Sequence, residues 1–159
     1  MALKLPPSGS RGFTMPRLMA PMARAGMGLV NFLYRFLGER MKVQGQPLLL
    51  LTTIGGRTGK RRQVLLGRFD DPDHPGAYWV VGSNNGATRH PAWCHNLAKN
   101  PDQVFIEIAG KEQPVLVESL EGEERARAWE RVVSLAKGYR RYERVTDRQI
   151  PIIRLTPQS

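Results

Sequence analysis

From residue 48 onward, the hydrophobic positions form short runs separated by turn-forming residues. Apolar and β-branched runs of this length are typical of β-strands. They predict strands over 48–53, 63–69, 77–83, 103–110, 112–119 and 150–155. A glycine-bearing turn separates the first two strands and a tight turn at Gly110 joins the fourth to the fifth, so both pairs are expected to form hairpins. Pro114 favours an edge or a bulge for the fifth strand, because proline cannot donate a ladder hydrogen bond.

Two segments among these strands have a helical pattern instead. Pro91 suits the first turn of a short helix that ends near Asn100. Residues 123–137 are acidic at their start and basic at their end, as the helix dipole favours. Strands that outnumber helices predict an α+β fold, a small and mostly antiparallel barrel rather than a parallel Rossmann sheet.

The N-terminal region has a different pattern. Residues 24–40 have a broad apolar face at helical spacing, while prolines at 16 and 21 delay a continuous helix until after residue 23. We therefore expect a flexible basic tail over 1–23, an amphipathic helix over 24–40 and a single domain over 41–159. Two interpretations of the helix stay open. It covers one side of the core, or it contacts a membrane surface or closes over a substrate pocket.

Composition adds a strong charge imbalance to this picture. The chain has 159 residues and a formal net charge of +10, which implies an acidic partner: a phosphorylated cofactor, nucleic acid or an anionic membrane. Its single cysteine, Cys94, cannot form an internal disulfide, which favours the cytoplasm. We expect neither a secretory signal nor a membrane span in the basic N-terminal region, because arginines interrupt its apolar run.

The basic residues are densest in TTIGGRTGKRR, residues 52–62. Its glycines permit close backbone approach, and four cations offer donors suited to phosphate or carboxylate: Arg57, Lys60, Arg61 and Arg62. The segment is not a P-loop, because Ile54 stands where the first glycine is required and Arg61 replaces the metal-binding Ser or Thr. It is either an anion cradle or a solvated basic hairpin.

Two further segments carry candidate chemistry. SNNGATRHPAWCHNL, residues 83–97, offers amides and hydroxyls at a strand end, followed by a helix N-terminus. A metal site is not expected there, because Cys94 and His95 are adjacent and point apart on a helix. In GYRRYERVTDR, residues 138–148, Tyr139 and Tyr142 are three apart and lie on one side of a short helix or turn. They are either pocket walls or anchoring rings at the surface.

Taken in order, these segments resemble a known family. TT.G....G..R, V.S..G...HP.W.HNL..NP..V, EER...W and Y..Y....DR.IP...L follow the pattern of the actinobacterial deazaflavin-dependent nitroreductases, also described as quinone reductases that use coenzyme F420. The resemblance implies a split β-barrel. It also implies hydride transfer from reduced F420, an 8-hydroxy-5-deazaflavin with a phosphate and an oligoglutamate tail, to a planar acceptor such as a quinone, an enone or a nitro compound.

The resemblance also implies roles for individual residues. Those matching the phosphate and tail site are Gly56, Arg57, Thr58 and Arg62. Those matching the strand along the coenzyme are Gln63, Val64, Leu65, Leu66 and Gly67. The segment beneath the ring corresponds to Val81, Gly82, Ser83 and Asn84, and the helix start near the ribityl chain to Ala92, Trp93, Cys94, His95 and Asn96. Tyr139 and Ser83 are the candidates for hydrogen-bonding or protonating the substrate, with Tyr142 as a pocket wall.

Four positions depart from the family pattern. Gly56 stands where many members have arginine, Asn84 where a nitroreductase has lysine, Cys94 where tyrosine is usual and Ala136 where a pocket tyrosine can occur. We expect these changes to affect nitroimidazole activation more than coenzyme binding.

Two alternative functions stay open: a split barrel that binds FMN, and a non-enzymatic basic module for membranes or nucleic acid. Nucleic acid is not expected, because no groove-binding helix or RNP-like strand is present. We expect a cytoplasmic enzyme, and peripheral membrane contact through its N-terminal helix stays one of the open interpretations of that helix.

Overall fold

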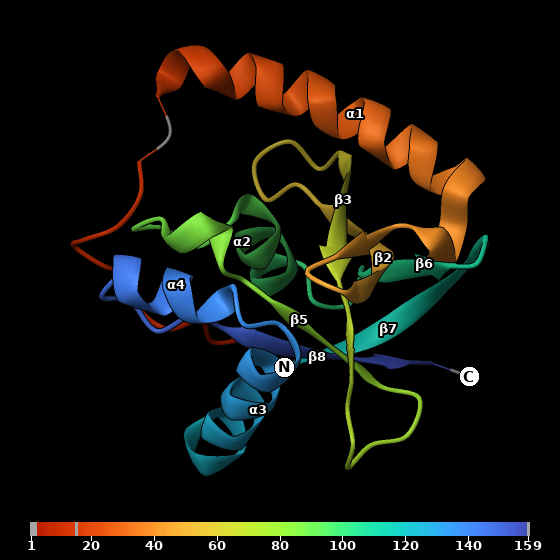
Figure 1. The fold of residues 1–159 in the computed structure, drawn as a ribbon. Helices are drawn as coiled ribbons and strands as arrows, with labels where there is room; N and C mark the ends of the chain where they lie inside the picture. Colours follow the sequence, from red (N-terminus) through yellow and green to blue (C-terminus); the bar gives the residue numbers. More distant parts are fainter. Residues whose placement is uncertain (1–2, 15, 159) are drawn as a thin grey trace.

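The computed structural model describes residues 3–14 and 16–158. Within these residues, a curled antiparallel sheet has the order β1-β2-β6-β7-β8-β5-β4, with β3 paired to the other edge of β2 (Figure 1). Its strands are β1 Lys42–Val43, β2 Gln46–Ile54, β3 Arg61–Gly67, β4 Phe69–Asp70, β5 Tyr78–Val81, β6 Phe105–Ile108, β7 Lys111–Ser119 and β8 Ile152–Pro157. The predicted α+β class and antiparallel, barrel-like sheet are confirmed.

The predicted hairpin at the start of the sheet is the β2–β3 pair. Its antiparallel register runs from Leu48 opposite Gly67 to Ile54 opposite Arg61. β2 is buried on both faces: Leu49 and Leu51 belong to the main core, whereas Leu48 and Leu50 pack with Tyr34. This double burial explains why β2 has a continuous apolar run rather than an alternating one.

Pro114 was expected at an edge or a bulge, and the edge position is wrong, because β7 is an inner strand of the sheet. β7 lies between two partners, pairing with β6 over residues 111–114 and with β8 over residues 115–119. Pro114 is therefore located where β7 changes partner. A residue that cannot donate to a ladder is tolerated at such a point.

Helices cover the sheet and its open end. They are α1 Ala20–Leu37, α2 Ala92–Lys99, α3 Gly122–Leu135 and α4 Tyr139–Val145, with short 3-10 turns η1 Arg17–Met19, η2 Gly38–Arg40 and η3 Asn84–Gly86. α1 starts earlier than the sequence suggested. Pro21 does not delay it, because proline is tolerated in the first turn, where its missing N–H has no helical partner.

α1 crosses over β2 and β3 (Figure 1) and turns one narrow face toward them. The Asn31 side-chain amide donates to the carbonyl oxygen of Gln63 at 3.5 Å, and buried Tyr34 donates to the carbonyl of Leu48 at 3.3 Å. On the opposite face, an apolar stripe is exposed to solvent: Met22, Leu29, Phe32, Leu33 and Phe36. The helix thus covers the core with few of its large apolar side chains.

The segment preceding α1 also lies against the body. Leu3 and Leu5 pack on the main core, and the Gly9 amide donates to the carbonyl of Thr88 at 2.8 Å. The backbone amides of Ser10 and Arg11 both donate to the carboxylate of Asp147. Residues 3–13 therefore form a strap beside the loop that follows β5, which the low hydrophobicity of this stretch did not indicate.

Candidate functional site

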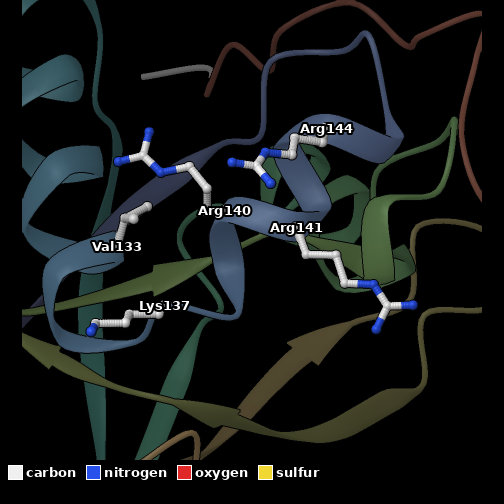
Figure 2. A pocket seen from close by; sticks show the side chains of 5 residues that line it. All are labelled: Val133, Lys137, Arg140, Arg141 and Arg144. Carbon is white, nitrogen blue, oxygen red and sulfur yellow. The ribbon is translucent and has the colours of Figure 1, made fainter.

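Two recesses open at the surface near α4. The larger, about 400 Å³, is lined by Val133, Lys137, Arg140, Arg141 and Arg144 (Figure 2). Arg140 is already engaged there with exposed carboxylates, Glu130 at 3.3 Å and Glu143 at 3.6 Å. This recess offers positive charge and one apolar side chain, but neither an apolar wall for a planar ring nor a neutral proton donor.

The smaller recess, about 150 Å³, lies on the other side of α4. It is lined by Val43, Gln44, Leu65, Leu66, Gly67, Val81, Ser83, Asn85, Tyr139 and Tyr142. It therefore unites β3, the end of β5 and α4, which the sequence had nominated separately. Two of its residues, Val43 and Gln44, were missed. The sequence indicates only that a turn is present at Gln44-Gly45. It does not indicate that this turn lies beside Tyr139 and β3.

Tyr139 is the most buried polar group of this recess. Its ring meets Phe69 edge-to-face at 5.9 Å and Tyr142 at 5.6 Å between ring centroids. Burial, with a smaller effect from Tyr142, raises the pKa of Tyr139 to about 12. The phenol therefore stays protonated at neutral pH and can donate a hydrogen bond or a proton.

The glycine-rich segment forms a tight turn between β2 and β3. The Gly55 amide donates to the carbonyl of Lys60 at 2.8 Å, and Gly59 has a φ of +67°, a conformation that favours glycine. α2 is attached to the same turn: Asn96 accepts a hydrogen bond from the Gly56 amide at 3.2 Å, and the Lys99 ammonium donates to the Gly56 carbonyl at 2.7 Å. The fold thus brings residues 55–60 and 96–99 together.

Charge at this turn is distributed differently from the prediction. Arg57, Lys60 and Arg62 are exposed, and among the described residues none of them forms an ion pair. Arg61 instead pairs with Glu112 and lies over the ring of Phe105. Lys99, which sequence reasoning did not single out, adds a cation beside Gly56. A Cβ at Gly56 would lie 3.0 Å from Cδ of Lys99, so the missing side chain leaves room for it.

Several other residues that the sequence suggested for the coenzyme site make contacts within the protein instead. Trp93 and Cys94 are buried in the main core, and burial raises the pKa of the Cys94 thiol. Asn84 is not in the lining of the recess; its side-chain amide donates to the carbonyl of Arg89 at 3.1 Å, and Asn85 lines the recess instead. Gly82 packs tightly, since a Cβ there would lie 2.7 Å from Pro151 and 2.8 Å from Cys94.

The remaining nominated residues lie along β3, at the turn and on α2. Val64 packs against the main core, and Gln63 donates to the hydroxyl of Thr52 at 3.3 Å. Thr58 accepts a hydrogen bond from the Lys60 amide at 3.3 Å. Ala92 and His95 are exposed on α2.

The donor set fits a ligand with a planar ring at one end and anionic groups at the other, as coenzyme F420 has. β3 connects the two halves of the site, and the three residue steps from Arg62 to Leu65 span about 10 Å in an extended strand. The ring end offers apolar walls and two phenols, and the other end offers exposed cations. The 150 Å³ recess is smaller than the roughly 300 Å³ of a complete ligand site, so it has room for only part of such a ligand.

Residues 3–14 and 16–158 contain no cluster of three or more histidine, cysteine or acidic side chains arranged to hold a metal ion. No helix within those ranges is long and apolar enough to cross a bilayer.

Comparison with known proteins gives consistent matches. Residues 30–157 match the family model described as F420H(2)-dependent quinone reductase. The Mycobacterium tuberculosis protein Rv3178, which carries the name of an F420H(2)-dependent quinone reductase, is 33% identical over 112 residues, 70% of this chain and 91% of its own. The solved structure of an F420-H2 dependent reductase, FDR-A, has a TM-score of 0.59 and 36% identity, covering 69% of this chain and 93% of its own. A second solved structure, described as a domain-swapped dimer, has a TM-score of 0.61 and 32% identity, covering 85% and 98%.

Proposed function

This chain belongs to the F420H(2)-dependent quinone reductase family, and we propose which of its residues hold the coenzyme and act on the acceptor. It is an oxidoreductase with coenzyme F420 as its cofactor, and its fold is a split β-barrel of the kind found in F420-dependent reductases. The proposal is carried by one observation: β3 joins an aromatic, apolar recess to a turn surrounded by exposed cations.

The basic turn is the proposed anchor for the phosphate and the oligoglutamate tail. Arg57 and Arg62 supply forked donors, exposed Lys60 adds charge in the same turn, and Lys99 adds charge beside Gly56. Leu65, Leu66 and Val81 are the proposed apolar surface for the ring. When bound, the reduced coenzyme supplies a hydride, and a quinone takes up this hydride and one proton to become a quinol.

The proton has two proposed donors on the protein, the Tyr139 phenol and the Ser83 hydroxyl. Both residues line the recess, and Tyr139 stays protonated over the physiological pH range because it is buried. A hydrogen bond from either group also stabilises negative charge on the acceptor oxygen as that charge develops. Tyr142 forms the wall beside Tyr139 and holds its ring edge-to-face.

A quinone is the acceptor class of the family, and enones and nitro compounds are proposed as further planar acceptors of the same recess. The test is a fluorescence titration of Trp79, Trp93 and Trp129 with F420 and separately with FMN, followed by F420H2 oxidation with a short-chain quinone. Tight F420 binding that salt weakens, with quinone-dependent turnover, supports the proposal. Tight FMN binding without F420 binding would overturn it.

We also propose that the enzyme acts in the cytoplasm at an anionic membrane surface, contacting it through α1. The apolar stripe on α1 lies opposite Tyr34, and within it Met22 is 76% and Phe36 74% exposed. Arg35 and Lys42 are exposed nearby, and the net charge of +10 favours anionic lipids. Apolar quinones concentrate at such a surface.

Flotation with vesicles of mixed anionic and zwitterionic lipid tests this contact in the full chain. The double variant Leu29→Ser and Phe36→Ser removes stripe residues without touching the buried Tyr34. Leu116→Ser, at a 59% exposed residue of β7, is the matched control. The α1 variant is expected to lose vesicle binding while keeping turnover with a soluble quinone; parent-like binding by it would remove the contact from the proposal.

A further inference from the structure

The turn that follows β5 has an unusual backbone. Asn84, Asn85 and Gly86 have φ angles of +44°, +53° and +76°, so three consecutive residues adopt the left-handed conformation. Such a run is unfavourable for L-residues and persists only where its surroundings hold it in place. Ser83 and Asn85 line the recess proposed for the reaction. A side chain that holds this turn in place therefore also positions one wall of the recess.

The side chain that holds the turn is that of Arg148, which is only 6% exposed. Its Nη1 donates to the carbonyl oxygen of Gly82 at 3.1 Å and its Nη2 to that of Ser83 at 2.7 Å, on the near side of the turn. Its Nε donates to the carbonyl of Ala87 at 2.7 Å, on the far side. One guanidinium thus bridges both ends of the left-handed segment. Among the described residues no carboxylate forms an ion pair with it, so its donors are given to this backbone.

His90 extends the arrangement to the N-terminal strap. Nη1 of Arg148 lies 3.0 Å from Nδ1 of His90, and a guanidinium can only donate, so Nδ1 is the acceptor. The remaining ring N–H, on Nε2, then donates to the carbonyl of Pro6 at 2.6 Å. His90 in this neutral tautomer connects the buried arginine to the strap.

The strap lies directly against the outer side of the turn. The Phe13 amide donates to the carbonyl of Gly86 at 3.0 Å. A Cβ added at Gly12 would lie only 2.5 Å from the carbonyl oxygen of Gly86, so only glycine permits this approach. The turn is therefore held from inside by Arg148 and from outside by residues 9–13.

We infer that Arg148 is a positioning residue of the reductase: through the carbonyls of Gly82, Ser83 and Ala87 it fixes the Ser83–Asn85 wall of the recess, and His90 couples the N-terminal strap to the same wall. The inference rests on the proposed function of the recess. Lysine is a poor substitute, because one ammonium lacks the planar fork that reaches acceptors on both sides of the turn. The cationic charge alone is therefore insufficient.

The first test is kinetic and uses Arg148→Lys and Arg148→Met in the full chain, with Arg144→Lys, an exposed residue of α4, as control. Both Arg148 variants are expected to lose at least about tenfold in kcat, while the Kd for F420 changes less than about threefold because the basic turn is untouched. In Arg148→Gly, millimolar guanidinium is expected to restore part of kcat. Parent-like kcat in Arg148→Lys would overturn the inference.

The second test needs neither coenzyme nor turnover. Hydrogen exchange in the coenzyme-free protein should be at least about tenfold faster at Gly86 and Ala87 in Arg148→Lys than in the parent, while the amides of β8 keep parent rates. His90→Gln should give a smaller acceleration over the same segment, and it serves if the Arg148 variants do not fold. Unchanged exchange over 83–90 in both variants would refute the positioning role.

The two tests separate the failure of this inference from that of the proposed function. A parent protein without F420H2-dependent turnover would contradict the proposed function, while the exchange experiment would still report on Arg148. An active parent with unaffected Arg148 variants would contradict the inference alone.

Discussion

The ammonium of Lys99 lies 2.7 Å from the carbonyl oxygen of Gly56, although 43 residues separate them in the chain. The contact places a cation of α2 on the turn between β2 and β3, at the position left open by the missing side chain of residue 56. A charge that an arginine could have supplied from the turn itself is thus available from a neighbouring helix.

Replacing Lys99 by methionine is expected to weaken F420 binding by about three- to tenfold at low salt, because one partly screened cation is removed from the proposed tail site. Lys99→Arg should retain most of the affinity. Fluorescence titration at two ionic strengths measures both. Lys111→Met, an exposed lysine at the start of β7, is the control and should bind like the parent. Parent-like affinity in Lys99→Met would exclude a role for the contact in binding.

The double variant Arg57→Ala and Arg62→Ala should lose more affinity, roughly tenfold or more at low salt, because two unpaired cations leave the site. The difference from the parent should shrink as salt rises. Arg127→Ala with Arg131→Ala removes the same charge from the exposed side of α3 and controls for net charge. Identical affinities for the double variant and the parent at every salt concentration would rule out the tail-binding assignment.

Tyr139→Phe is expected to lower kcat by about tenfold to a hundredfold with little change in the Kd for F420, since it removes a proton donor and keeps the ring. Ser83→Ala in the same background should lower kcat further if the two hydroxyls share the role. Because burial raises the pKa of Tyr139 to about 12, the tyrosine itself should contribute no pH dependence of kcat between pH 6 and about 9. A kcat in Tyr139→Phe equal to that of the parent would leave Ser83 or water as donor.

Arg154 should be a large contributor to stability. It is 4% exposed and donates to Asp71 at 2.6 Å, to Glu118 at 2.8 Å and to Glu124. Burial by itself would raise the pKa of Asp71, but hydrogen bonds from Arg154, the Asp73 amide and Trp79 lower it, so the carboxylate stays charged. Arg154→Met leaves that charge buried and should cost about 3–5 kcal/mol in the free energy of unfolding.

Urea unfolding measures this loss. Arg140→Met breaks only exposed ion pairs and should stay within about 1 kcal/mol of the parent. Equal losses in the two variants would mean that the Asp71–Arg154 network is not an integral part of the core.

His90 is expected to make stability depend on pH. Burial, together with nearby Arg148 and His95, lowers the pKa of His90 below its usual 6.5, although the Pro6 carbonyl opposes the shift. The unfolded chain then binds more protons than the native state below about pH 6.5, so this contribution is present above that pH and is lost on acidification. The loss is at most about 1.4 kcal/mol per pH unit.

Urea midpoints at pH 7.5 and at a mildly acidic pH test this, with His90→Gln beside the parent. The variant should lose less stability between the two conditions. Lys111→Gln, at an exposed residue of β7, is the control and should follow the parent; His95 is unsuitable, because its ring lies 6.0 Å from that of His90. A parent-like pH dependence in His90→Gln would assign the effect to other groups.

Much of the local architecture could be predicted because it depends on neighbours in the chain. The apolar runs at 48–53 and 63–69 with a glycine turn between them suffice for the β2–β3 hairpin, and the charge gradient of residues 123–137 suits α3. Pro114 was misplaced because its missing N–H is tolerated at a change of pairing partner as well as at an edge. The spacing of glycines, cations and tyrosines also sufficed to nominate the turn, the end of β5 and α4 as parts of one site.

Which side chains meet at that site is a matter of tertiary contact between distant segments. Lys99 reaches the turn between β2 and β3 only because α2 packs beside that turn. Arg61 forms an ion pair with Glu112 of β7 and is therefore not free to bind an anion. Arg148 had no sequence signal of its own beyond the shared motif. Its importance depends on the left-handed turn Asn84–Gly86, which lies far earlier in the chain. Among the described side chains, only Arg148 donates hydrogen bonds to the carbonyls that flank this turn, those of Gly82, Ser83 and Ala87. Sequence periodicity fixes which residues can share an element, whereas burial and packing between elements decide which donors remain free for a ligand.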